Sequence, residues 1–297
     1  MEKSKTATLA GDSLERRHMF SLMLEIFSYP FMVRAILVGT FVALCSSLLG
    51  VSLVLKRYSM IGDGLSHVGF GALALATALN AAPLSVAIPV VVAASFVLLR
   101  ISENSKIKGD AAIALISTGA LATGVMILSM TTGMNTDVCN YLFGSILGMS
   151  RNDVYLSLAL SIAILLMFIL FYNRIFAITF DESFASATGN RSGFYNMLIA
   201  LMSALIIVLG MRMMGALLIS SLIVFPALTS MRLCRKFRAV IINSALISVI
   251  CLWIGIVISY QYATPTGASI VICNIAAFLL YWLIQTIKKT FFHKQTT

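Results

Sequence analysis

A carboxylate and an imidazole lie inside a long apolar stretch of this sequence, residues 56–75, KRYSMIGDGLSHVGFGALAL. Asp63 and His67 are four residues apart, so on an α-helix both side chains share one face, one turn apart. Ionisable groups within a membrane span are costly and usually face a bundle interior or a water-filled path. Carboxylate oxygen and imidazole nitrogen both bind zinc at about 2.0–2.2 Å. The pair therefore offers half of a four-ligand site for a first-row metal.

A second interpretation is a buried Asp–His hydrogen bond that only locks two helices together. The pair alone does not decide between the two, because intramembrane charges are usually functional but short motifs often match by chance. The chain has three histidines, of which His18 and His293 lie in the polar terminal tails. His67 is the only one inside an apolar run, which favours metal handling.

The composition is that of a membrane protein. Of 297 residues, 60% are hydrophobic and 11% charged, against about a quarter charged in a soluble domain. The net charge of +10 does not indicate nucleic-acid binding, because the Lys and Arg residues sit in short gaps between apolar runs. The five cysteines show no CxxC spacing and read as small buried hydrophobes, with Cys139, beside Asp137, as a weak metal candidate.

The sequence predicts an all-α polytopic membrane protein with eight or nine transmembrane helices. Each apolar run is close to the roughly 20 residues that span a bilayer. The runs are 31–55, 61–80, 84–100, 111–132, 154–172, 194–212, 214–230, 240–260 and 267–287. We expect a transmembrane domain over 31–287, an N-terminal tail over 1–30, and a cytoplasmic tail over 288–297. Residues 14–29 form either an interfacial helix or part of a disordered tail, and 139–149 are short enough to be re-entrant.

Basic residues between the runs predict the orientation. Arg232, Arg235, Lys236 and Arg238 mark the strongest cytoplasmic loop, and Lys288 places the C-terminus inside. Counting back places Lys56 and Arg57 inside as well. Nine spans would put the N-terminus outside, whereas the basic residues of the N-terminal tail favour the inside, so this side stays open.

The gap at residues 173–193 predicts a short cytoplasmic helix over about 180–188. Thr179 and Glu182 have the spacing of a capping box, with Asp181 and Glu182 in the first turn, and Gly189 is placed as the helix stop. Phe180 and Phe184 would share one apolar side. The composition alone leaves a protein partner and the lipid surface as alternative contacts for this side.

Several ordered phrases together resemble the membrane permeases of the bacterial ABC importers for zinc, manganese and iron, the ABC-3 family. The similarity covers nearly everything from Tyr29 to Gln285. The phrases are YPFMVRAILVGT, LLGVSLVLKRYSMIGDGLSHVGFGALAL, YLFGSILGMSRND, FDESFASATGN, GALLISSLIVFPALTS and TPTGASIVI. No G-x-x-x-x-G-K-[ST] motif occurs, so this chain is not expected to bind ATP itself by a P-loop.

The resemblance implies a homodimer or a close pair of permeases in the bacterial plasma membrane. The partners it implies are a cytoplasmic ATP-binding subunit and an extracytoplasmic metal-binding protein. Asp63 and His67 match the family's metal-contacting Asp and His, and residues 180–189 match its coupling helix. The ATPase-coupling residues implied are Thr179, Phe180, Asp181, Glu182, Phe184, Ala185 and Gly189. The chain itself would be a transport subunit without enzymatic activity or a permanently bound cofactor, and the metal would be its cargo.

The metal is less well defined. Many manganese permeases of this family read DAISHAVLPG where this chain reads DGLSHVGFGA, which favours zinc, with manganese or iron as the alternatives. Two other hypotheses remain open from the residues: a proton-coupled secondary metal transporter using Asp63 and His67, and a membrane scaffold with a structural Asp–His pair.

Overall fold

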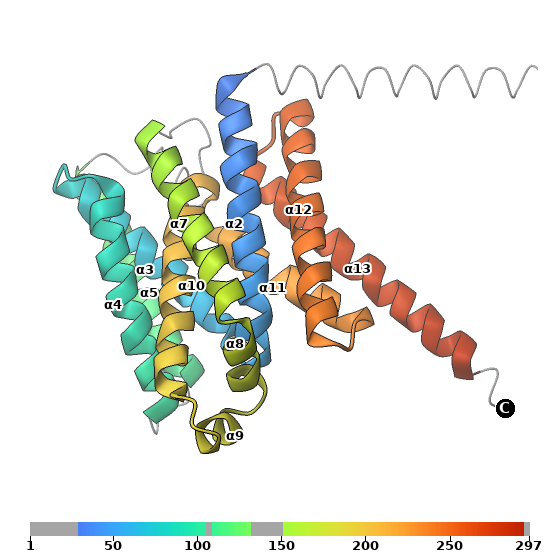
Figure 1. Ribbon diagram of the computed structural model, residues 1–297. Coiled ribbons are helices and arrows are strands. Elements are labelled where there is room, and N and C mark those ends of the chain that lie inside the picture. The colour runs from blue at the N-terminus through green and yellow to red at the C-terminus, as the bar shows by residue number, and fades with distance from the viewer. Residues whose placement is uncertain (1–28, 105–108, 132–150, 294–297) are drawn as a thin grey trace, which may run out of the picture.

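The computed structural model describes residues 29–104, 109–131 and 151–293, and these residues form a helical bundle (Figure 1). The prediction of an all-α polytopic membrane protein is confirmed, and most of each predicted apolar run lies in one long helix, with boundaries that differ by a few residues. The helices are α2 Pro30–Leu55, α3 Ser59–Ala78, α4 Pro83–Asn104, α5 Gly109–Thr131, α7 Arg151–Leu170, α8 Tyr172–Phe180, α9 Glu182–Ala187, α10 Ser192–Met214, α11 Ala216–Leu233, α12 Phe237–Tyr262 and α13 Thr266–His293.

Eight of the described helices are long and apolar enough to cross a membrane, and α3 is a further 20-residue helix that carries Asp63 and His67. Helices α2, α3 and α4 alternate in direction. Lys56, at the end of α2, shares a small cavity with Ser95 and Leu99 in the second half of α4, so α4 returns to the face that α3 leaves. The described residues thus contain eight candidate spans, which agrees with the predicted eight or nine.

Helix α9, the end of α2 and the end of α13 all lie toward the lower end of the molecule in Figure 1. The charge bias predicts that this end is cytoplasmic, because the basic residues from Arg232 to Arg238 surround Phe237, which packs against Phe180 just before α9. Helix α2 begins at the opposite end, so its first residue is expected on the outer face.

Helix α2 lies in the centre of the bundle and packs against α10, α11 and α12. Its contact with α11 depends on a glycine: a Cβ added at Gly50 would lie 2.0 Å from the backbone oxygen of Ile223. Close approach of this kind is how small residues let membrane helices pack tightly. Ile223 also lies beside Gly62 in α3, so this contact sets the position of the helix that bears Asp63.

We therefore expect Gly50→Ala to destabilise the folded protein by about 1–3 kcal/mol, as overpacking of a filled core does. Gly119→Ala is the matched control, because a Cβ at Gly119 in α5 meets nothing within 4 Å. In that helix, alanine should stabilise by up to about 1 kcal/mol. Thermal unfolding of both variants in detergent checks the opposite signs, and equal effects would contradict the described α2–α11 contact.

The predicted capping box at Thr179 is wrong. Residues 172–180 form their own helix, α8, and the Thr179 hydroxyl donates to the Ile175 carbonyl within it at 2.6 Å. The short helix α9 begins at Glu182, and its N-cap is Asp181, whose Oδ1 accepts from the Phe184 amide at 2.8 Å. Burial of Ile175 and Ile178 stabilises helix α8, which fills the part of the gap before the short helix that we predicted.

The predicted stop at Gly189 is confirmed. Gly189 has φ +85°, its amide donates to the Ser186 carbonyl, and the Asn190 amide donates to the Ala185 carbonyl, both at 3.0 Å. These two bonds form a Schellman motif, in which glycine takes the left-handed position without a steric penalty.

Some expectations fall outside the described residues: most of the N-terminal tail, the short stretch 139–149, and the weak metal candidates Asp137 and Cys139. At the other end, α13 continues to His293, beyond the start of the tail that we placed at 288.

Candidate functional site

A tight corner positions the start of α3. Arg57 adopts a left-handed conformation with φ 62°, and the Tyr58 amide donates to the Leu53 carbonyl at 2.8 Å. Helix α3 then begins at Ser59, directly after this corner. Further along, a Cβ at Gly71 would lie 2.8 Å from the Ala120 backbone oxygen, so α3 rests directly on α5. Asp63 therefore lies between two fixed points of α3, the corner before Ser59 and the contact at Gly71.

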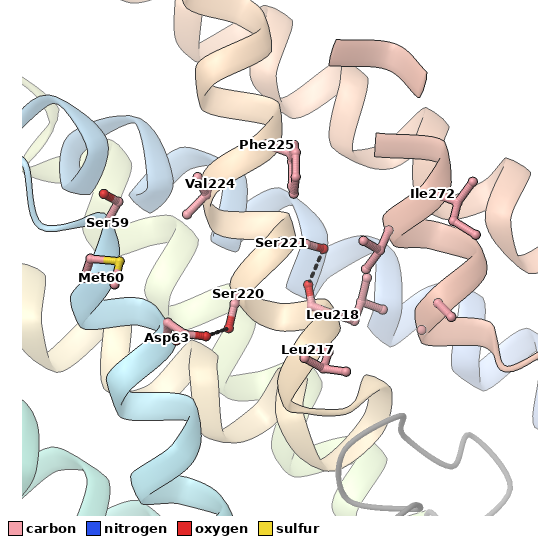
Figure 2. A pocket seen from close by; sticks show the side chains of 13 residues that line it. Ser59, Met60, Asp63, Leu217, Leu218, Ser220, Ser221, Val224, Phe225 and Ile272 are labelled. Atoms are coloured by element: carbon pink, nitrogen blue, oxygen red, sulfur yellow. Dashed lines mark hydrogen bonds between the residues drawn. The ribbon is translucent and has the colours of Figure 1, made fainter. Parts of the chain in front are cut away.

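The Asp63 carboxylate points toward α11 (Figure 2). The Ser220 hydroxyl lies 3.1 Å from Asp63 Oδ1 and 3.1 Å from the Ala216 carbonyl, and it can donate to either. Ser66, one turn away, donates to the Asp63 backbone carbonyl at 2.7 Å. The Asp63 side chain is 47% exposed, so one of its faces stays available to a ligand.

His67 lies one turn further along α3, on the same face as Asp63, as the spacing predicts. Its Nε2 is 3.7 Å from Asp63 Oδ2, which is longer than a hydrogen bond. Its Nδ1 is buried and has no hydrogen-bond partner among the described residues. The structure therefore does not contain an Asp–His hydrogen bond that joins two helices. Both residues belong to α3, and Ser220 links Asp63 to α11.

A cavity of about 520 Å³ opens beside Asp63, between α3, α11 and α13 (Figure 2). Asp63 is the one charged residue in its lining, and Ser59, Ser220 and Ser221 add hydroxyl groups. The other lining residues are Met60, Leu217, Leu218, Val224, Phe225, Gly267, Ala268, Val271 and Ile272. His67 is not part of this lining, so of the two residues only Asp63 faces the cavity.

A half-exposed carboxylate in an apolar cavity attracts a cation, because little else near it compensates the negative charge. In the described parts of the chain, no cluster of three or more His, Cys, Asp and Glu residues could hold a metal. One copy thus presents one carboxylate and one imidazole. Sequence reasoning did not single out Ser220 as a site residue, because small polar residues in a span usually indicate helix packing.

The second predicted site, helix α9, presents an apolar side chain at the basic end of the bundle. Phe184 is 65% exposed and Phe180, at the end of α8, is 59% exposed. Ala185 is buried against the bundle instead. The predicted shared apolar side therefore consists of two phenylalanines from neighbouring helices, rather than of one face of one helix.

Residues 28–285 match the family described as the ABC 3 transport family. A "Probable iron transport system membrane protein" of Haemophilus influenzae is 32% identical over 269 residues, covering 90% of this chain and 94% of that protein. The "Manganese transport system membrane protein MntC" of Halalkalibacterium halodurans is 28% identical over 256 residues, covering 86% and 88%.

A solved structure, "PsaBC from Streptococcus pneumoniae in complex with Fab", has the same fold. It superimposes with a TM-score of 0.80 at 26% identity, covering 89% of this chain and 95% of that one.

Proposed function

Because this chain belongs to the ABC 3 transport family, we propose that it is the membrane permease of an ATP-driven importer of a divalent transition metal. It is a multi-pass plasma-membrane protein. The observation that carries the proposal is the half-exposed Asp63 carboxylate, which faces a cavity between membrane-spanning helices with His67 one turn away. Intramembrane carboxylates in such positions commonly mark ion pathways.

The cargo is manganese or iron in this proposal. Both metals appear in the names of the relatives, and both accept carboxylate and imidazole ligands. Zinc remains the alternative, which rests on the sequence DGLSHVGFGA around the site and has no counterpart among those names. An open, two-ligand site in one copy suits a cargo that must be released again.

A second copy of the chain would complete the site. A two-fold axis close to α3 would bring two Asp63 and two His67 side chains together, which is a four-ligand set for a first-row metal. The other proposed partners are a cytoplasmic ATP-binding subunit, which would hydrolyse ATP, and an extracytoplasmic metal-binding protein. The family relationship supports both of them.

Competitive uptake tests this function. We expect the complex of permease and ATP-binding subunit, reconstituted in liposomes with internal ATP, to accumulate manganese or iron when the metal-binding protein delivers it. A proton ionophore should leave uptake intact, because ATP provides the energy. Uptake that needs no ATP and stops with the ionophore would instead favour a proton-coupled transporter, and excess zinc that abolishes manganese uptake and is itself imported would assign zinc.

A further inference from the structure

A buried cation connects α9 to the corner before α3. In the sequence, Lys56 only adds to the positive charge of a loop. In the folded chain its side chain is buried, with only 7% exposed. Its Nζ lies 3.2 Å from Glu182 Oε2 and also donates to Asn196 Oδ1. Asn196 Nδ2 in turn donates to Glu182 Oε1 at 2.7 Å. These three side chains, the Lys56 network, form a closed triangle between α2, α9 and α10.

The network holds the beginning of α9. Glu182 is the first residue of α9 and follows its N-cap Asp181 directly, so a shift of α9 necessarily carries the Glu182 carboxylate with it. The preceding helix α8 is attached elsewhere: Phe176 and Phe180 pack against Phe237 at the start of α12, with ring centroids 5.0 and 5.6 Å apart. Helix α8 is therefore linked to α12 by aromatic contacts, whereas α9 is linked to the α2–α3 corner by the Lys56 network.

The other end of the network leads to Asp63. Lys56 caps α2, and only Arg57 and Tyr58 separate it from Ser59, the first residue of α3. The hydrogen bond from the Tyr58 amide to the Leu53 carbonyl keeps this corner compact. A displacement of Lys56 thus moves the first turns of α3, and α3 meets α11 through Asp63 and Ser220.

We propose that Lys56, Glu182 and Asn196 are positioning residues that transmit a displacement of α9 to α3 and so change the position of Asp63 relative to α11. This inference rests on the proposed function, in which a cytoplasmic ATPase moves α9. The network makes α9 and the start of α3 one mechanical unit. Stabilisation alone would not account for such a network, since buried ion pairs contribute little net stability.

Lys56→Met is the informative variant. It removes the buried charge and leaves Glu182, which is 43% exposed and can be hydrated. Glu182→Gln is less suitable because it leaves Lys56 buried without its counter-ion. Arg57→Met is the matched control: it removes one positive charge at the next residue, where the exposed side chain forms no ion pair with any described residue.

In the reconstituted complex, metal uptake and ATP hydrolysis are measured in the same sample. We expect Lys56→Met to lower the metal transported per ATP at least about fivefold, the lower end of measured coupling between sites. Hydrolysis and assembly with the ATPase should persist, and Arg57→Met should behave as the wild type. A Lys56→Met complex with lower thermal stability but an unchanged ratio would overturn the inference and leave a structural ion pair.

Distances measured in the wild-type complex test the same proposal and do not require Lys56→Met to fold. Bio-orthogonal spin labels at Arg57 and Ser186 report the separation of the corner from α9, and a pair at Arg57 and Leu233 reports the separation of the corner from the end of α11. On ATP binding by the wild-type complex, the first distance should stay constant while the second changes. A change in the first distance would overturn the inference, as would constancy of both. A wild-type complex without any metal uptake would refute the proposed function. The two distances would still test whether α9 and the start of α3 move together.

Discussion

Asp63→Asn and His67→Ala are expected to fold and reach the membrane with their ATPase, yet to lose at least about tenfold in metal uptake per folded transporter. The estimate is conservative, because changes in groups that only support a metal ligand already cost 10–100-fold. In a two-fold dimer each substitution removes two ligands from one site. Asp63→Asn keeps the shape of the side chain and its contact with Ser220, and removes only the charge. The amount of folded protein and the uptake are measured together.

Asp153→Asn is the matched control. Asp153 in α7 also belongs to an ion pair between described helices, with Arg212 in α10 at 3.1 Å. It lies outside the lining of the Asp63 cavity. We expect this variant to lose stability and to keep its uptake per folded molecule. If Asp63 were only structural, its variant would behave in the same way, with a loss of about 0.6–1.7 kcal/mol as for interhelical hydrogen bonds in membranes.

The second large effect is expected at Phe184. An aromatic side chain that is 65% exposed at the basic end of the bundle is well placed to fill a groove of the ATP-binding subunit. Phe184→Asp should therefore weaken association by about 2 kcal/mol or more, roughly thirtyfold in Kd. Titration of the detergent-solubilised permease with the purified ATPase measures this change.

Phe184→Leu controls for the loss of the ring, because it keeps an apolar side chain and should retain most of the affinity. Asp181 and Gly189, which cap α9, stay intact in both variants, so the helix itself should persist. Undiminished affinity and uptake in Phe184→Asp would remove α9 from the ATPase interface and leave the membrane surface as the contact of this side chain.

Hydrophobic run length predicted the helices well, since a span needs a nearly continuous apolar segment. The boundaries at residues 172–189 were predicted less well. Thr179 and Glu182 have the spacing of a capping box, but Thr179 bonds within α8, and Asp181 takes the cap instead. Two short helices in immediate succession give overlapping signals, and burial of Ile175 and Ile178 decides between them. Gly189 was predictable because a helix stop requires its left-handed conformation.

The predicted Asp63–His67 pair lies on one face of α3, because helix geometry alone sets that relation. The contact of Asp63 with Ser220 was not predictable, since 157 residues separate the two and serine in a span has an ordinary packing explanation. The same holds for Lys56. Its charge at a helix end fits the orientation bias, while its partners Glu182 and Asn196 come from helices that meet it only in the folded bundle.

The central claim is that the metal contacts Asp63 and His67 on its way across the membrane. Electron spin-echo spectroscopy of Mn²⁺ tests it most directly when the ion is trapped in the complex by a non-hydrolysable ATP analogue. The account predicts modulation from a histidine nitrogen in the wild type, no such modulation in His67→Ala, and loss of the bound ion in Asp63→Asn. Trapped Mn²⁺ that keeps its nitrogen modulation in His67→Ala, or that binds equally well to Asp63→Asn, would contradict the account.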